Sequence, residues 1–234
     1  MKIFLLLLLK LSLLASIGNI MAIKGSANIE RGSQKIEATN GMELEKGDSI
    51  LTMKKSRVQV MLKDETVVTI GASSSFSFLE YFYDESQKSK LTMQANRGFF
   101  RSVTGRIGKL APERFKVKTA SATIGIRGTD FSGNISANRE VFKCYEGMIY
   151  VEFKGGSRDV SAGMMAEIFK GKLGVRRYRG VAFRKGKGRT VIPTEVISDI
   201  TQILEDDNNV ENVNNNNADD LDVSTSSEDR ESEY

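Results

Sequence analysis

The sequence predicts an all-β fold of many short strands, and two observations carry this prediction. Apolar and polar residues alternate over short stretches, which is the pattern of half-buried strands. Glycine supplies most of the breaks between them, since the 234 residues include 21 glycines and only two prolines. Such spacing suits a β-sandwich, a barrel or a short β-solenoid, and the absence of a repeat of fixed length argues against a regular solenoid.

The first 22 residues predict a cleavable export signal. Met1 and Lys2 form a positive start, a run rich in Leu and Ile follows, and Ala22 is a small residue suited to cleavage, which would make Ile23 the first mature residue. The rival interpretation is an uncleaved membrane anchor, because the apolar stretch is about long enough to span a bilayer. Lys10 favours cleavage, because a lysine in mid-span costs about 2.5–3.5 kcal/mol on insertion scales.

A β domain is expected over residues 23–170. Its strands are predicted from the alternation and from the glycine or charged turns between them. Their expected bounds are 26–30, 33–37, 48–53, 56–63, 66–70, 75–82, 89–95, 98–103, 114–119, 129–134, 139–145, 148–154 and 164–169.

The stretch from Phe76 to Tyr83 is the densest aromatic segment of the chain. Alternation would place Phe76, Phe78, Glu80 and Phe82 on one face, and the other face would also be partly apolar. A strand buried on both sides is favoured, and an exposed platform for sugar rings or a partner's side chains is the alternative.

Cys144 is the only cysteine, so no disulfide can form within the chain. Alternation places it on the same face as Phe142 and opposite Lys143. A buried cysteine that acts as a small apolar side chain is favoured over a reactive or intermolecular thiol.

The C-terminal part divides by charge. Residues 171–204 form a basic extension, and the acid-free stretch from Lys170 to Arg189 interleaves its cations with Tyr178 and Phe183. An apolar stripe predicts a short helix over 194–204. Residues 205–234 carry 11 acidic residues against one arginine and few apolar side chains, which predicts a disordered acidic tail. The tail could shield the basic segment or simply remain solvated.

The most informative motif follows the strand from Phe115 to Thr119. Two glycines three residues apart, Gly125 and Gly128, flank an arginine, which predicts a tight backbone corner that requires glycine at one of them. The segment resembles the core of the FecR domain, a periplasmic module with the pattern phenylalanine-x-valine-x-threonine, a spacer and arginine-glycine-threonine-x-phenylalanine. The matching residues are Phe115, Val117, Thr119, Arg127, Gly128, Thr129 and Phe131.

The resemblance covers roughly residues 23–170 in order. It includes the glycine-aspartate step at Gly47–Thr52, the next strand at Ser56–Leu62, and the steps at Glu146–Val151 and Ser161–Met164. One departure is clear, because the aspartate-glycine hairpin of the family is here Lys63-Asp64-Glu65-Thr66. Glu65 tolerates a positive φ less well than glycine, so a looser turn or another turn type is expected.

The resemblance implies a β-roll or solenoid-like stack that engages a protein partner. Many FecR-like regulators place a sigma-factor-binding segment in the cytoplasm, before a transmembrane helix. Here Met1 and Lys2 alone precede the apolar segment, so a direct anti-sigma role is not expected.

Enzymatic activity is not expected. The chain has no histidine, which excludes serine or cysteine catalysis through histidine and the common zinc sites that use it. The segment between Gly125 and Gly128 is too short for a phosphate-binding loop. No catalytic residue, metal or cofactor is predicted.

Two functional classes remain. The first is an exported, periplasmic module for protein interaction or envelope signalling, with an unidentified envelope protein as its partner. The second binds envelope carbohydrate or anionic polymer and lipid surfaces, whereas nucleic acid is not expected in that compartment. Arg127 could bind a partner's acidic group, but an internal structural role is favoured for the motif Gly125, Arg127, Gly128, Thr129 and Phe131. The cations that could contact an anion or partner are Arg176, Arg177, Arg179, Arg184, Lys185, Lys187 and Arg189.

Overall fold

The computed structural model describes residues 16–178 and confirms the all-β class. One helical turn and one 3-10 turn lie between the ninth and tenth strands, and no helix in this range is long and apolar enough to cross a membrane. The elements are β1 (Ser16–Lys24), β2 (Ala27–Arg31), β3 (Gln34–Glu37), β4 (Glu43–Glu45), β5 (Ser49–Thr52), β6 (Arg57–Leu62), β7 (Val67–Ile70), β8 (Ser75–Phe82), β9 (Lys90–Val103), α1 (Ile107–Leu110), η1 (Pro112–Arg114), β10 (Phe115–Lys118), β11 (Ala122–Ile135), β12 (Arg139–Phe153), β13 (Gly156–Ser161), β14 (Met164–Phe169) and β15 (Lys172–Arg177).

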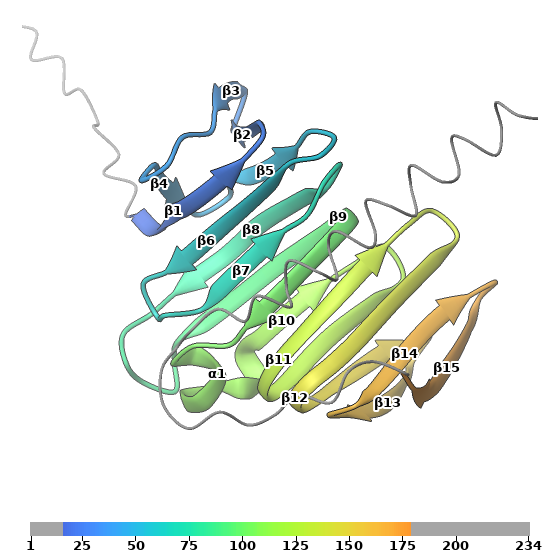
Figure 1. Cartoon of the computed structure of the whole chain (residues 1–234). Helices are drawn as coiled ribbons and strands as arrows, with labels where there is room; N and C mark the ends of the chain where they lie inside the picture. Colours follow the sequence, from blue (N-terminus) through green and yellow to red (C-terminus); the bar gives the residue numbers. More distant parts are fainter. Residues whose placement is uncertain (1–15, 179–234) are drawn as a thin grey trace, which may run out of the picture. The chain divides into compact units, whose positions relative to one another are not determined.

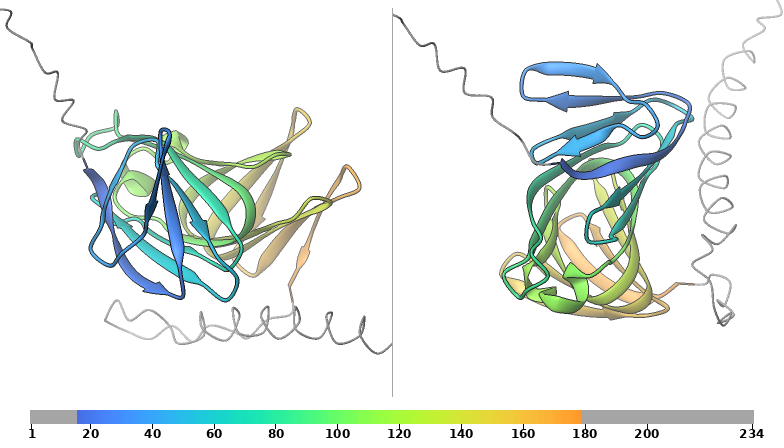
Figure 2. Two further views of the ribbon diagram at one scale, coloured as in Figure 1. Left: turned by 90° about the horizontal axis from the view of Figure 1, so that it is seen from above. Right: turned by 90° about the vertical axis from the view of Figure 1, so that its left-hand side faces the viewer.

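The strands form one open sheet that folds over itself into two layers (Figures 1 and 2). The first layer has the order β4-β1-β6-β7-β9-β11-β12-β14-β15, and the second has the order β3-β2-β5-β8-β9-β10-β11-β12-β13. The expected solenoid-like stack is not confirmed. Coils of a solenoid pair in parallel, whereas among the described strands β9 and β10 alone do so.

Three long strands, β9, β11 and β12, run through both layers and bend at glycines with positive φ. Gly98 has φ +84°, Gly128 has φ +57° and Gly147 has φ +73°. On either side of each bend the strand exchanges partners; β12, for example, pairs with β14 before Gly147 and with β13 after it. At both Gly98 and Gly147 the sequence predicted that one strand ends and another begins. The chain instead continues through both, because a left-handed residue can turn a strand without ending its pairing.

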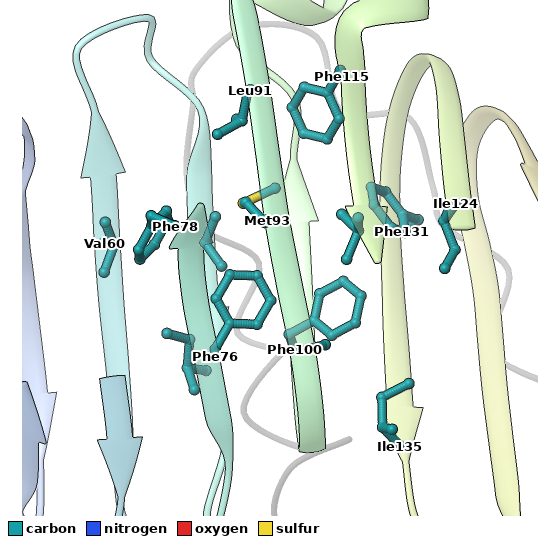
Figure 3. Close-up of a cluster of buried hydrophobic side chains, with 14 of the residues drawn as sticks. Val60, Phe76, Phe78, Leu91, Met93, Phe100, Phe115, Ile124, Phe131 and Ile135 are labelled. Atoms are coloured by element: carbon teal, nitrogen blue, oxygen red, sulfur yellow. The ribbon is translucent and has the colours of Figure 1, made fainter. Parts of the chain in front are cut away.

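The core fills the space between the two layers, and phenylalanine rings connect them (Figure 3). Phe100 lies 5.3 Å from Phe76 and 5.8 Å from Phe131 between ring centroids, and the second pair meets edge to face. All three side chains are at most 1% exposed. Phe131 of the family motif therefore belongs to the centre of the core.

The folded domain extends beyond the expected bounds of 23 and 170 at both ends. β1 begins at Ser16, inside the predicted export signal, and β15 lies inside the predicted basic extension. The sequence did not predict β1, because its residues continue the apolar run before it. It did not predict β15, because cations surround Leu173 and Val175, which pack against the core. The strands β4 and β13 and the first half of β11 were also not predicted, because each has few apolar residues or contains the glycine motif.

The aromatic strand β8 changes face at a bulge. The register with β9 shifts between Phe78 and Glu80, so the alternation slips by one residue. Phe76 and Phe78 are buried as predicted, whereas Phe82 is 52% exposed and Tyr81 packs against the core instead. The prediction that Phe76, Phe78, Glu80 and Phe82 share one face is therefore wrong beyond Phe78.

The turn between β6 and β7 places a non-glycine residue in a strained conformation. Glu65 has φ +68°, a left-handed conformation that glycine adopts more easily. We expect Glu65→Gly to raise the free energy of unfolding by about 0.5–1 kcal/mol, because the exposed ion pair of Glu65 with Arg106 contributes less than the relieved strain. Urea denaturation would measure the change, and an equal or lower midpoint would contradict it.

The predicted helix over 194–204, the acidic tail over 205–234 and the cations Arg179, Arg184, Lys185, Lys187 and Arg189 lie outside the described residues.

Candidate functional site

The family motif lies on β10 and β11, which are neighbours in the second layer. Val117, Ile124 and Ile126 point into the core and are at most 1% exposed. The residues between them point outward, and on β10 these are Lys116 and Lys118. Alternation therefore gives the motif strands an apolar inner face and a basic outer face.

The two motif glycines serve different purposes. Gly128 forms the corner, and Thr104 holds it by donating its hydroxyl to the Thr129 carbonyl at 3.0 Å and accepting the Thr129 amide at 2.9 Å. Gly125 has no positive φ but lies beneath the Tyr150 ring, where a Cβ would come within 2.0 Å of ring carbons. The predicted need for glycine at one position is therefore a need at both.

Arg127 is exposed, and no hydrogen bond or ion pair of its side chain occurs among residues 16–178. The favoured interpretation placed it against an internal carboxylate or on free carbonyls at the corner. The geometry does not support that role, because the alternation of β11 directs Arg127 to the outer face while Ile126 enters the core.

The cations Arg114, Lys116, Lys118 and Arg127 form one surface, which we call the basic face. Register brings it together: Lys116 pairs with Gly125, and Lys118 pairs with Thr123, two residues along the neighbouring strand. All four side chains are exposed and have no ion-pair partner in the described part of the chain. A hollow of about 330 Å³ adjoins them and is lined by Glu80, Lys90, Thr92, Glu113, Arg114, Lys116 and Lys118.

Three carboxylates, Glu80, Glu113 and Glu152, lie near this surface. Glu80 accepts hydrogen bonds from Lys90 and Thr92, both at 2.8 Å, and these bonds lower its pKa. Burial raises the pKa of Tyr150, and the nearby charges of Glu152 and Glu113 add to that effect. Glu80 is therefore occupied by Lys90, and neither Glu113 nor Glu152 forms an ion pair with a cation of the basic face among residues 16–178, so these cations remain available to an anionic group.

The sequence did not predict a second polar cluster, on the outer side of the first layer. Arg101 is 6% exposed and donates to both carboxylate oxygens of Asp130, at 2.8 and 2.7 Å. Its guanidinium lies 4.6 Å from the centre of the Tyr145 ring, and the Tyr145 hydroxyl is 2.9 Å from the Ser132 hydroxyl. Asp130 lies inside the motif, so the sequence could have indicated a polar cluster there. Its partner Arg101 is 29 residues away in the chain, and only the fold brings the two together.

A second hollow, of about 430 Å³, lies where four turns meet, between β10 and β11, β11 and β12, β12 and β13, and β14 and β15. Glu140 is 3% exposed there and accepts hydrogen bonds from Thr119 at 2.7 Å and Ser121 at 2.8 Å. Both donors belong to the turn between β10 and β11. Glu140 therefore stabilises that turn.

Of the predicted anion-contacting cations, the structure describes Arg176 and Arg177. Both are exposed on the edge strand β15, and Arg176 lies 3.2 Å from Glu167. They belong to the first layer, whereas the basic face belongs to the second. Among residues 16–178, no cluster of three or more acidic, cysteine or histidine side chains could hold a metal ion.

Cys144 is fully buried, as predicted, and burial raises its pKa to about 11. At pH 8 only about one thiol in a thousand would be ionised, so we expect the native protein to resist iodoacetamide. The same protein in urea should be alkylated completely, and mass spectrometry would measure both. Rapid alkylation of the native protein would contradict the buried position.

The fold and the motif define a class of protein. Residues 48–150 match the model of a family described as FecR protein, so the chain contains a FecR domain, and the resemblance drawn from the motif is confirmed. The match runs from Asp48, just before β5, to Tyr150 in β12, and includes all three bends.

Two crystal structures of a candidate anti-sigma factor from Parabacteroides distasonis ATCC 8503 are similar to this chain. Both are 16% identical to it, with TM-scores of 0.46 and 0.47, over 55% of this chain. The chain spans 59% of the length of each of those proteins. No curated protein matches the chain significantly.

Proposed function

We propose that this is an exported, periplasmic FecR-domain protein that acts without enzymatic activity, as an envelope signalling or sensory module that binds a protein partner. The observation that carries the proposal is the basic face, where the motif arginine and three neighbouring cations are exposed and unpaired among the described residues. Such an array is suited to an acidic surface on another protein, because a planar guanidinium can bind a carboxylate through two hydrogen bonds.

The FecR domain supports a regulatory role rather than a catalytic one. The described carboxylates also favour binding over catalysis. Asp48 is held by Arg31 and Asp64 accepts from Thr66, so these two buried acids have structural partners of their own.

The test is a charge-reversal variant, Lys116→Glu/Lys118→Glu/Arg127→Glu, compared with wild type in retaining proteins from a periplasmic extract. We expect the variant to weaken binding of the retained partner by about tenfold or more, because repulsion replaces attraction. A matched control, Lys35→Glu/Lys46→Glu/Lys54→Glu, makes the same change at exposed lysines outside the basic face and should bind like wild type. Equal binding by both variants would exclude the basic face.

The identity of the bound species separates this proposal from the alternative, a module for envelope carbohydrate or anionic lipid and polymer. The exposed cations of β15 and of the basic face support that alternative, because they attract any anionic surface without specific contacts. Saturable retention of one defined protein at low salt supports the protein partner, and because the cations are exposed it should weaken in about 1 M salt, where the Debye length is ~3 Å. Binding to lipopolysaccharide or cell-wall preparations that salt abolishes supports the alternative.

A further inference from the structure

The strand β1 is the second strand from one edge of the first layer. It lies between β4 and β6 (Figure 1) and contributes two buried side chains, Ile17 at 3% and Ile20 at 0% exposure. Two further backbone hydrogen bonds hold β1 in place. The Ile20 amide donates to the Met42 carbonyl, and the Lys63 amide donates to the Ile17 carbonyl. The residues before Ala22 are therefore part of the fold.

Gly18 shows how closely β1 is packed. A Cβ at this position would lie 2.3 Å from the Met61 carbonyl oxygen and 2.6 Å from the Leu62 Cα, both backbone atoms of β6. Neither atom can move away as a flexible side chain could. The contact is made by a residue that cleavage after Ala22 would remove.

Cleavage after Ala22 would leave Ile23 and Lys24 as the remnant of β1. The pairs of Gly18, Asn19 and Ile20 with β6 would be lost, and β4 would lose the strand it pairs with. Leu44 of β4, which is fully buried, would lose its pairing with Gly18. A mature chain that starts at Ile23 is therefore incompatible with the first layer as it stands.

The same strand argues against the membrane anchor. When residues from Ser16 onward belong to the domain, the apolar run that remains is Ile3–Ala15, bounded by Lys2. Its 13 residues would extend about 20 Å as a helix, whereas the hydrocarbon core of a bilayer is about 30 Å thick. A run of this length is typical of the apolar part of an export signal.

We infer that the export signal ends at Ala15 and that Ser16 is the first residue of the mature protein. The inference rests on the proposed export. A signal peptidase would hydrolyse the Ala15–Ser16 peptide bond with water, leaving a carboxylate on Ala15 and an amine on Ser16. Ala15 is a small residue, as such cleavage requires directly before the cut, and a cut there keeps every described residue of β1 in the mature protein. The third residue before the cut is Leu13 at this site and Ile20 for a cut after Ala22, so that position does not separate the two sites.

The test is the intact mass of the full-length chain after expression in a Gram-negative host, measured in periplasmic, membrane and cytoplasmic fractions. Two variants are compared with wild type, Ala15→Leu and Ala22→Leu, each of which places a large residue where one of the rival sites needs a small one. Ala22 is exposed, so the fold tolerates leucine there. We expect a periplasmic species that starts at Ser16, blocked by Ala15→Leu and unaffected by Ala22→Leu.

The other outcomes separate the two proposals. A periplasmic species that starts at Ile23, or at any residue other than Ser16, overturns the processing site and leaves export intact. A full-length species in membranes also overturns the processing site, because the anchor is then retained. A full-length species in the cytoplasm overturns export as well.

A stability measurement checks the inference without relying on a cleavage variant. Gly18→Ala should lower the melting temperature of the purified mature protein by about 10 °C, whereas Met21→Ala, at a side chain 48% exposed on the same strand, should change it little. If both variants melt like wild type, β1 is not part of the mature domain and the inference fails.

Discussion

Gly147→Ala is expected to unfold the domain or to lower its free energy of unfolding by about 4 kcal/mol or more. A Cβ at this position would lie 1.9 Å from the Gly128 carbonyl oxygen and 2.9 Å from the Arg127 carbonyl oxygen. Both are backbone atoms at the neighbouring bend. The substitution therefore drives apart the two points at which β11 and β12 cross between the layers. Gly147 also has a φ of +73°, which is strained for any residue with a side chain.

The matched control is Gly163→Ala. Gly163 also has a positive φ, of +80°, but nothing lies within 4 Å of the position that its Cβ would take. We expect this variant to lose about 1–2 kcal/mol, which is the cost of the left-handed conformation alone. Urea denaturation measures both variants. Equal losses would mean that the close contact between the bends of β11 and β12 has no role in stability.

Asp48→Ala is expected to cost about 2–3 kcal/mol, because it removes a buried carboxylate that accepts two charged hydrogen bonds from Arg31, while Arg31 keeps its ion pair with Glu45 at 2.6 Å. Asp48 is fully buried and accepts from the Arg31 Nε at 2.9 Å and Nη2 at 2.7 Å. It also accepts the Glu45 amide at 2.8 Å, which closes the loop between β4 and β5. The aspartate of the glycine-aspartate motif therefore joins β2 to that loop.

A double-mutant cycle with Arg31→Ala would measure the interaction energy between Arg31 and Asp48. The double variant should lose less free energy of unfolding than the two single variants lose together. Asp48→Asn keeps the shape and removes the charge, and it should recover only part of the stability. The exposed pair of Glu85 with Arg106 is the control, since Glu85→Ala should cost about 0–1 kcal/mol. Additive losses in the cycle would contradict a direct interaction between Arg31 and Asp48.

The sequence determined the fold class and the family. Alternation is a local property that each strand carries by itself, so β8 and β10 could be read from their own residues. The FecR motif was equally local, since Arg127, Gly128 and Phe131 stand within five residues. Burial of Cys144 followed from the same alternation and is confirmed.

The sequence could not show how the strands continue. A glycine that ends a strand and one that bends it look the same, and Gly98 and Gly147 were interpreted as ends. The difference depends on whether a partner strand lies beyond the glycine, which is a tertiary fact. The bulge in β8 is of the same kind, because its register is set by β9.

The candidate site divides in the same way. That Lys116, Lys118 and Arg127 are cationic is written in the sequence, but that they share one face depends on the pairing of β10 with β11. Arg101 and Asp130 meet across 29 residues for the same reason. The N-terminal strand gives the sharpest case: its apolar residues are equally suited to an export signal and to a core strand. Only the tertiary structure decided between them, because side-chain chemistry is local and the partner strands β4 and β6 are not.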